Sequence, residues 1–314
     1  MKAIHFHAFG GPEVLKVVSL AAPHPGPGQV RIVVRAAGVN TSDWKKRQGL
    51  MDQGLPQTLE YEAAGIVDEL GDGVTDVAPG ERVVGFCTDG AAQAELAVLT
   101  YYRPIPPTLS FEVAASLPAA IETAAHALDQ LGVTRDACLL INGATGNIGA
   151  AAVQLALTRG ARVIGIASAA RRGDLRSLGA EPIAYGEGMP DSVRALAPEG
   201  VDFVLDVAGN GILPELIALT KETRPERVIT VADFDGAMRH GVRFSRGDDG
   251  RALYVLARIG ELATSGKFRL PAVRTVPFAE VAQAHRVGEA GTATGKRVLT
   301  MSTCPARDQA GESK

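Results

Sequence analysis

The chain has 314 residues, of which 46% are hydrophobic and 21% charged, as in a folded globular protein long enough for two domains. Its net charge of −3 argues against nucleic-acid and anionic-membrane partners, which require concentrated basic charge. The chain opens without the charged, apolar and small-residue order of a signal peptide, and no apolar run reaches spanning length. We therefore expect a cytoplasmic protein.

The N-terminal part is predicted to be rich in β-structure. Residues 1–112 contain short apolar segments broken by glycine and proline, such as residues 30–37 and 64–70. This pattern predicts a small barrel of short strands. A helical pattern at 279–290 and a strand at 297–301 follow the middle of the chain, and we expect residues 272–314 to complete this first domain.

The middle of the chain, residues 113–271, is predicted to form an α/β nucleotide-binding domain. Short apolar segments alternate with helical patterns, and the predicted strands lie at 137–141, 162–167, 181–185, 201–207 and 227–231. Such alternation indicates a doubly wound parallel sheet covered by helices on both faces, which is the Rossmann arrangement.

A glycine-containing turn joins the first of these strands to an alanine-rich helix. Its glycines permit a tight turn, close approach of a pyrophosphate to main-chain N–H groups and close packing of the helix on the strand. The spacing lacks the closely spaced first glycine pair of the usual dinucleotide motif, so an ordinary strand-to-helix turn is the alternative. The predicted cofactor-binding residues here are Gly143, Thr145, Gly146, Asn147, Ile148 and Gly149.

The end of the second predicted strand indicates which dinucleotide binds. NAD sites usually carry an acidic residue about 20 positions after the glycines, whereas NADP sites supply cations instead. Here the positions hold Ser168, Arg171 and Arg172 and no carboxylate, which predicts a pocket for the 2′-phosphate of NADPH. Alternatively, Ser168 caps a helix that exposes the two arginines.

Residues after the fifth strand belong to the same predicted site. Ligands of open parallel sheets lie beyond the carboxyl ends of the strands. We therefore expect Val231 and Ala232 to approach the nicotinamide ribose.

Several short motifs, in their order and spacing, resemble the zinc-independent quinone oxidoreductase branch of the medium-chain dehydrogenase/reductase superfamily. They include residues 9–15, 37–45, 62–67, 80–85 and 295–299 and the glycine turn. The resemblance covers nearly the whole chain. It implies a GroES-like barrel domain, a Rossmann domain, a nucleotide between them and a homodimer.

The resemblance also suggests roles for individual residues. Asn40 and Tyr61 stand where zinc-dependent relatives have a cysteine and a histidine ligand, so no metal is expected. Asn40 is a candidate to bind the acceptor or the nicotinamide ribose, or else a turn residue. Tyr61 is a candidate proton donor or a packing residue. Glu60 replaces the usual glycine of the family.

Two further residues are carried over as candidates for cofactor binding. Asp206 ends the fourth strand, where the backbone of the family contacts the nucleotide, and is otherwise a strand-end turn carboxylate. Lys296 is expected to reach the nicotinamide region or else to be solvated.

These features predict an NADPH-dependent reductase. Without a Lewis acid to stabilise an alkoxide, hydride transfer suits small-molecule acceptors that delocalise charge themselves, namely quinones and α,β-unsaturated carbonyls. An enoyl-thioester reductase and a noncatalytic NADPH-binding sensor or structural protein are the alternatives, because a fold alone does not guarantee turnover.

Overall fold

The computed structural model describes residues 1–87, 91–247, 250–266, 268–291 and 294–301. They form two compact units: Met1–Ser116 with the described residues from Ala272 onward, and the described residues of Leu117–Pro271. Each unit has its own sheet and its own buried core. None of the helices in the described ranges has the length and apolar character needed to cross a membrane.

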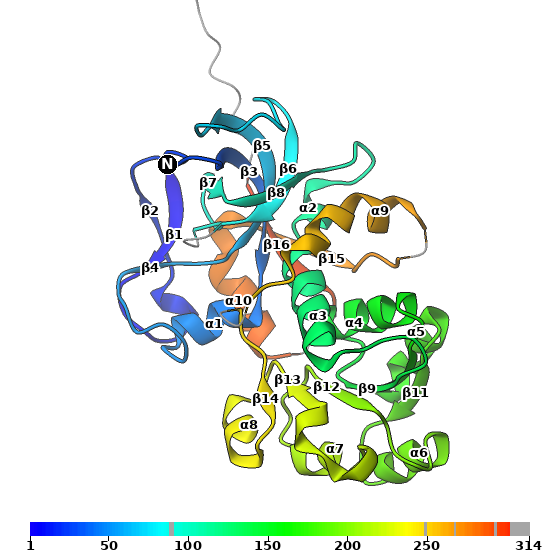
Figure 1. Ribbon diagram of the computed structural model, residues 1–314. Coiled ribbons are helices and arrows are strands. Elements are labelled where there is room, and N and C mark those ends of the chain that lie inside the picture. The colour runs from blue at the N-terminus through cyan, green and yellow to red at the C-terminus, as the bar shows by residue number, and fades with distance from the viewer. Residues whose placement is uncertain (88–90, 248–249, 267, 292–293, 302–314) are drawn as a thin grey trace, which may run out of the picture. The chain divides into compact units, whose positions relative to one another are not determined.

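The first unit is β-rich, as predicted. Its main sheet has the order β15-β16-β3-β5-β6-β8, with β7 also paired to β3, and a smaller sheet has the order β2-β1-β4 (Figure 1). Side chains of β3 alternate between buried and half-buried over its first half, as expected for a strand with one face on the core. The strands are β1 (Lys2–Phe6), β2 (Lys16–Ser19), β3 (Val30–Val39), β4 (Gln57–Thr58), β5 (Glu62–Leu70), β6 (Arg82–Phe86), β7 (Leu96–Leu99), β8 (Tyr101–Pro104), β15 (Val273–Pro277) and β16 (Lys296–Thr300).

Short helices complete the first unit. The segment α1 (Thr41–Arg47) starts at Asn40, whose backbone N–H donates to Asp43 Oδ2 at 2.8 Å in a capping box. The segment α10 (Val281–Glu289) buries Val281 and Ala284 against a core that includes Leu299. The remaining helical segments are α2 (Phe111–Ala114), η1 (Pro12–Val14) and η6 (Phe278–Glu280).

The register of β16, β3 and β5 brings distant parts of the sequence together. Arg297 pairs with Val39, and Ala63 pairs with Ala37, so Lys296 and residue 62 lie beside the end of β3. A Cβ at Gly38 would clash with the Glu62 side chain, so the glycine lets that side chain lie across β3.

The second unit contains a parallel sheet, which confirms the predicted α/β class. Within the described residues the strand order is β11-β10-β9-β12-β13-β14, and every neighbouring pair is parallel. This is the doubly wound order, in which the strand sequence reverses direction beside the first strand. The strands are β9 (Cys138–Asn142), β10 (Arg162–Ala167), β11 (Glu181–Ala184), β12 (Phe203–Asp206), β13 (Val228–Thr230) and β14 (Arg243–Phe244).

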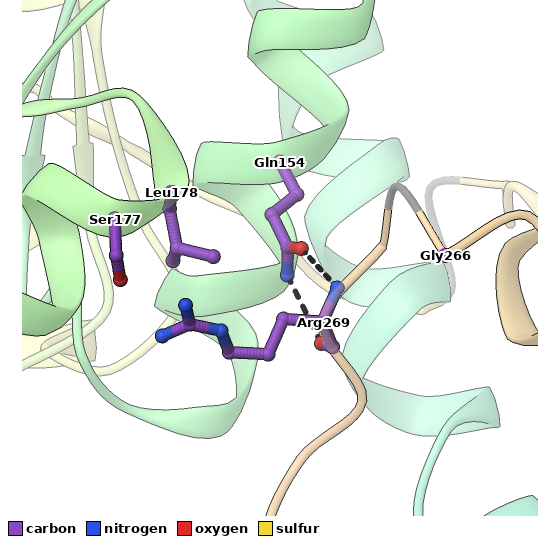
Figure 2. Close-up of a pocket in the computed structure, with 5 residues that line it drawn as sticks. All are labelled: Gln154, Ser177, Leu178, Gly266 and Arg269. Carbon is purple, nitrogen blue, oxygen red and sulfur yellow. Dashed lines mark hydrogen bonds between the residues drawn. The ribbon is translucent and has the colours of Figure 1, made fainter.

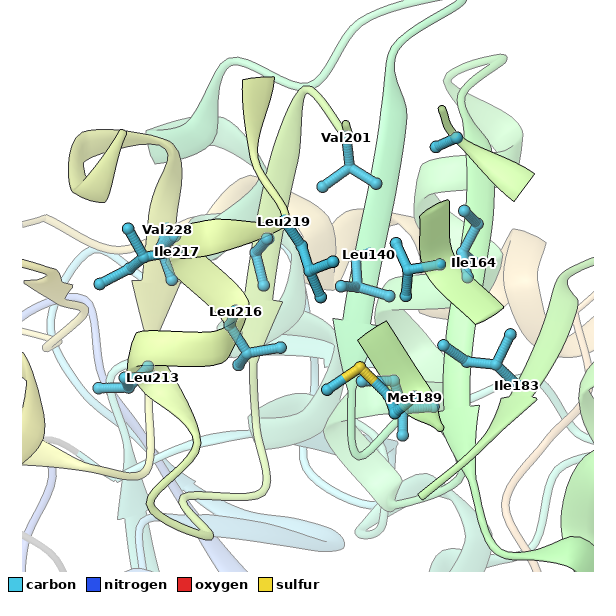
Figure 3. Packing of buried hydrophobic residues seen from close by; sticks show 14 of the residues in the cluster. Leu140, Ile164, Ile183, Met189, Val201, Leu213, Leu216, Ile217, Leu219 and Val228 are labelled. Atoms are coloured by element: carbon cyan, nitrogen blue, oxygen red, sulfur yellow. The ribbon is translucent and has the colours of Figure 1, made fainter. Parts of the chain in front are cut away.

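Helices cover both faces of this sheet. On one face α3 and α4 pack together and against β9, β10, β12 and β13 (Figure 1). On the other, Met189 of α6 and Leu213 and Leu216 of α7 pack on Leu140 and Ile164 of the sheet (Figure 3). The helical segments are α3 (Pro118–Leu131), α4 (Asn147–Thr158), α5 (Arg172–Leu178), α6 (Met189–Leu196), α7 (Leu213–Ala218), α8 (Phe234–His240), α9 (Ile259–Thr264), η2 (Ala169–Arg171), η3 (Lys221–Thr223), η4 (Pro225–Arg227) and η5 (Leu253–Arg258).

Candidate functional site

The glycine turn lies between the carboxyl end of β9 and the start of α4. Gly143 has a φ of +84°, a left-handed conformation that glycine adopts without strain. Gly149 is buried, and a Cβ there would lie 2.8 Å from Ala144 Cα and closer still to the Gly143 carbonyl oxygen. Both glycines are therefore required by the fold of the turn.

Gly146 is different, because the fold does not require a glycine there. Its φ of −71° suits any residue, and an added Cβ would meet only the Gly143 carbonyl oxygen, at 3.5 Å. Gly146 and Asn147 are exposed, whereas Thr145 and Ile148 are half-buried. The α4 helix starts without a side-chain cap, so no capping side chain satisfies its first amide groups.

The end of β10 presents the predicted phosphate-binding residues. Ser168 is exposed and precedes the short η2 turn without capping it through its side chain. Arg171 Nε donates to Asp174 Oδ2 at 2.8 Å, so this guanidinium is shared with a carboxylate. Arg172 has no acidic partner within ion-pair distance in the described part of the chain. Of the two arginines, Arg171 is therefore the one whose charge is already paired with a carboxylate.

The Asp206 carboxylate is hydrogen-bonded to other groups of the protein. It is 1% exposed, and its Oδ1 accepts from Asn142 Nδ2 at 2.8 Å and from the N–H groups of Ala208 and Gly209, both at 3.1 Å. Its Oδ2 accepts from the Thr230 hydroxyl at 2.7 Å. Asp206 thus ties together the carboxyl ends of β9, β12 and β13.

The turn after β13 is held by the same network. The Val231 N–H donates to the Asp206 carbonyl oxygen at 3.0 Å, and the Ala232 N–H donates to Thr230 Oγ1 at 3.1 Å. Gly209 has a φ of +61° and packs closely on Ala232. The turns after β12 and β13 therefore form one surface beside the glycine turn.

Tyr185 is a further residue of this edge that the sequence analysis did not assign to the site. It follows β11, and its phenol lies near the backbone of Gly143. Burial of the ring raises the pKa of the Tyr185 hydroxyl. Its position directly after a parallel strand was the available signal.

A second group of predicted residues lies in the first unit. Asn40 Nδ2 donates to both carboxyl oxygens of Glu60, each at 3.0 Å, and to Glu62 Oε1 at 2.9 Å. Lys296 Nζ donates to Asn40 Oδ1 and, at 2.6 Å, to Glu62 Oε1. The Asn40 amide thus donates to the carboxyl groups of Glu60 and Glu62, and Lys296 Nζ is hydrogen-bonded within this cluster.

The cluster also contains a pair of buried acids. Asp43 and Glu60 are each 2% exposed and hydrogen-bonded to each other. Burial raises the pKa of both carboxyls, and the neighbouring Asp43 charge raises that of Glu60 further, well above its usual value. Of the two carboxyls, Glu60 is therefore the one whose pKa is raised further.

Tyr61 lies next to this cluster and is only partly buried. Lys46 Nζ donates to its hydroxyl at 3.5 Å and lies 5.3 Å from the centre of its ring. Because the phenol oxygen accepts this contact, the phenol keeps its own hydrogen to donate elsewhere.

A separate cavity of about 280 Å³ lies in the second unit (Figure 2). It is lined by Gln154 of α4, Ser177 and Leu178 at the end of α5, Gly266 and Arg269. The Gln154 amide accepts from the Arg269 N–H at 2.6 Å and donates to its carbonyl oxygen at 3.3 Å. None of the residues predicted from the sequence lines it.

Comparison with known proteins identifies the family. The model of the alcohol dehydrogenase GroES-like domain matches residues 26–112, and that of a zinc-binding dehydrogenase matches residues 178–299. The quinone oxidoreductase of Coxiella burnetii superposes with a TM-score of 0.83 and 31% identity, over 96% of this chain and 99% of that structure. The chain belongs to the quinone oxidoreductase branch of the medium-chain dehydrogenase/reductase superfamily.

Curated relatives match different shares of this chain. The spectinabilin polyketide synthase system protein NorB of Streptomyces orinoci is 34% identical over 305 residues, which is 93% of this chain but 14% of NorB. The quinone oxidoreductase of Rattus norvegicus is 39% identical over 175 residues, or 53% of each protein. The chain thus spans only part of the length of these relatives.

Proposed function

We propose that the chain is an NADPH-dependent reductase that transfers hydride to a quinone or to the β-carbon of an α,β-unsaturated carbonyl, without zinc. The observation that carries the proposal is Gly146: the protein's own packing leaves room for a side chain there, directly over the amide groups that begin α4. A glycine that the fold does not need fits a position where a pyrophosphate approaches the backbone.

The residues at the carboxyl edge fit NADPH. The backbone of residues 145–149 would hold the pyrophosphate, while Ser168 and Arg172 would hold the 2′-phosphate, with Arg171 at its side. We propose that Asp206 contributes by fixing the surface formed by Gly209, Val231 and Ala232. When bound, the nicotinamide supplies the hydride.

Zinc independence is supported by the chemistry of the cluster around Asn40. An amide and a phenol stand at the positions of the two zinc ligands, and neither is a usual zinc ligand. The Lys296 ammonium already supplies the positive charge beside Glu62, with 1% and 0% of the two side chains exposed. A second cation next to it would be repelled.

We propose Tyr61 as the proton donor to the reduced acceptor and Asn40 as the residue that organises the cluster beside it. Quinones and enones need a proton where negative charge develops, and a partly exposed phenol can supply it. Lys296 would then support this donor through its hydrogen bond to Asn40. Replacing Tyr61 by Phe is expected to lower kcat with little effect on the KM for NADPH.

An enoyl-thioester reductase is the second candidate. It is favoured by the match to NorB, a polyketide synthase system protein, over 93% of this chain. Its acceptor is also an α,β-unsaturated carbonyl, so the same donor and cofactor residues would serve.

The test compares the rates of NADPH consumption with a quinone, a 2-alkenal and an enoyl thioester. Turnover with the quinone or the alkenal supports the proposal, and preference for the thioester promotes the second candidate. NADPH binding without reduction of any of these acceptors would instead favour a noncatalytic NADPH-binding protein.

A further inference from the structure

Glu60 has a backbone conformation that is unusual for its residue type. Its φ is +69°, in the left-handed region that favours glycine, and it is buried. A fully enclosed acid in such a conformation persists only where its surroundings hold it. The contacts of its side chain show which groups Glu60 positions.

The Glu60 carboxyl joins three segments of the first unit. Its Oε1 accepts from the N–H groups of Tyr61 and Glu62 at 3.0 and 3.1 Å, so the side chain folds back over its own turn. The same carboxyl accepts from Asn40 Nδ2 and contacts Asp43 at the start of α1. One side chain thus orients the Asn40 amide and the turn that carries the Tyr61 phenol.

The charges around Glu60 are compatible with a neutral side chain. Asp43 faces it from α1, Glu62 from β5 and Lys296 from β16, while Lys46 lies beside the neighbouring Tyr61. Lys296 is already bound to Glu62, so a second and a third buried carboxylate would leave excess negative charge. A protonated Glu60 instead donates a hydrogen bond to Asp43.

We propose that Glu60 is a positioning residue, which as a neutral carboxylic acid fixes the Asn40 amide and the Tyr61 turn for protonation of the reduced acceptor. This inference rests on the proposed function. Glu60 acts through Asn40 and Tyr61 and gives up no proton itself.

Two substitutions separate this positioning role from that of a proton donor and from that of a purely structural residue. Glu60→Gln keeps an acceptor for the two N–H groups and for Asn40, and its Nε2 can donate to Asp43 as the neutral acid does. Glu60→Gly removes the carboxyl and suits the positive φ. We expect Glu60→Gln to keep turnover within about threefold of wild type, and Glu60→Gly to lose about tenfold or more in kcat.

The pH profile gives a readout that a purely structural role would not move. Wild-type kcat is expected to fall at alkaline pH as Glu60 loses its proton, whereas Glu60→Gln is expected to lack this decline. The wild-type-minus-Gln difference infrared spectrum should contain the band of a protonated carboxylic acid at neutral pH. Melting temperature and NADPH affinity serve as controls for folding.

Each outcome decides the proposal. A Gln variant as impaired as the Gly variant would identify Glu60 as the proton donor itself, and unchanged kcat in both variants would reduce it to a structural residue; both overturn the inference. Absence of the carboxylic acid band would also overturn it. A wild-type protein that reduces no acceptor would contradict the proposed function instead, which the wild-type assay shows separately.

Discussion

Two glycines of the same turn offer a matched test of the cofactor site. Gly149→Ala would place a methyl group 2.8 Å from Ala144 Cα and closer to the Gly143 carbonyl oxygen, and backbone atoms cannot move aside cheaply. We expect a loss of about 3 kcal/mol in the free energy of unfolding. Gly146→Ala meets only one atom at 3.5 Å in a compatible conformation, so we expect a loss of no more than about 1 kcal/mol.

Gly149→Ala should be the more damaging of the two variants for stability, and Gly146→Ala the more damaging for cofactor binding. The Gly146→Ala methyl group would stand over the first amide groups of α4, and we expect its NADPH dissociation constant to rise about tenfold or more, or about 1.4 kcal/mol. Urea unfolding measures the free energy of unfolding, and titration of NADPH fluorescence measures the dissociation constant. A stable Gly146→Ala protein that binds NADPH as tightly as wild type would refute the reasoning.

Three other changes test separate parts of the account. Arg172→Ala is expected to raise the KM for NADPH about tenfold and to leave that for NADH unchanged, in steady-state assays with each cofactor. Lys296→Met leaves Glu62 as an uncompensated buried charge and should cost about 3 kcal/mol in urea unfolding, whereas a solvated lysine would cost almost nothing. Burial lowers the pKa of His285 to about 3, so between about pH 6.5 and pH 3 the unfolded chain binds this proton and the folded chain does not. As the pH is lowered from 6 to 4, the free energy of unfolding should therefore fall by up to about 1.4 kcal/mol per pH unit through this group, and His285→Leu should remove that dependence.

Local patterns in the sequence were sufficient for the fold. The apolar segment at 137–141 and the helical patterns at 213–219 and 279–290 correspond to β9, α7 and α10. Alternation of strands and helices leads to a parallel sheet for a general reason, since parallel strands need crossover connections. The two-residue strand β14 was missed because so short a segment has no periodicity to detect.

The candidate site was harder to predict, because its geometry depends on the register of the strands and on which buried polar groups hydrogen-bond to one another. Lys296 meets Asn40 and Glu62 through the pairing of β16 with β3 and of β3 with β5, across more than 230 residues of sequence. The sequence identifies Asp206 at a strand end but does not show that its carboxylate is saturated by internal donors. Similarly, the usual glycine of the family at position 60 was the available signal of the positive φ, but nothing local to Glu60 indicates its contact with Asp43.

The central claim is that this chain reduces its acceptor with NADPH and without a metal. The most direct test measures the rate of quinone reduction by chelator-treated protein of known metal content, with NADPH and NADH in parallel. The account predicts undiminished turnover of the metal-free protein and a strong preference for NADPH. Loss of activity on chelation with recovery on adding zinc, or equal rates with NADH, would contradict it.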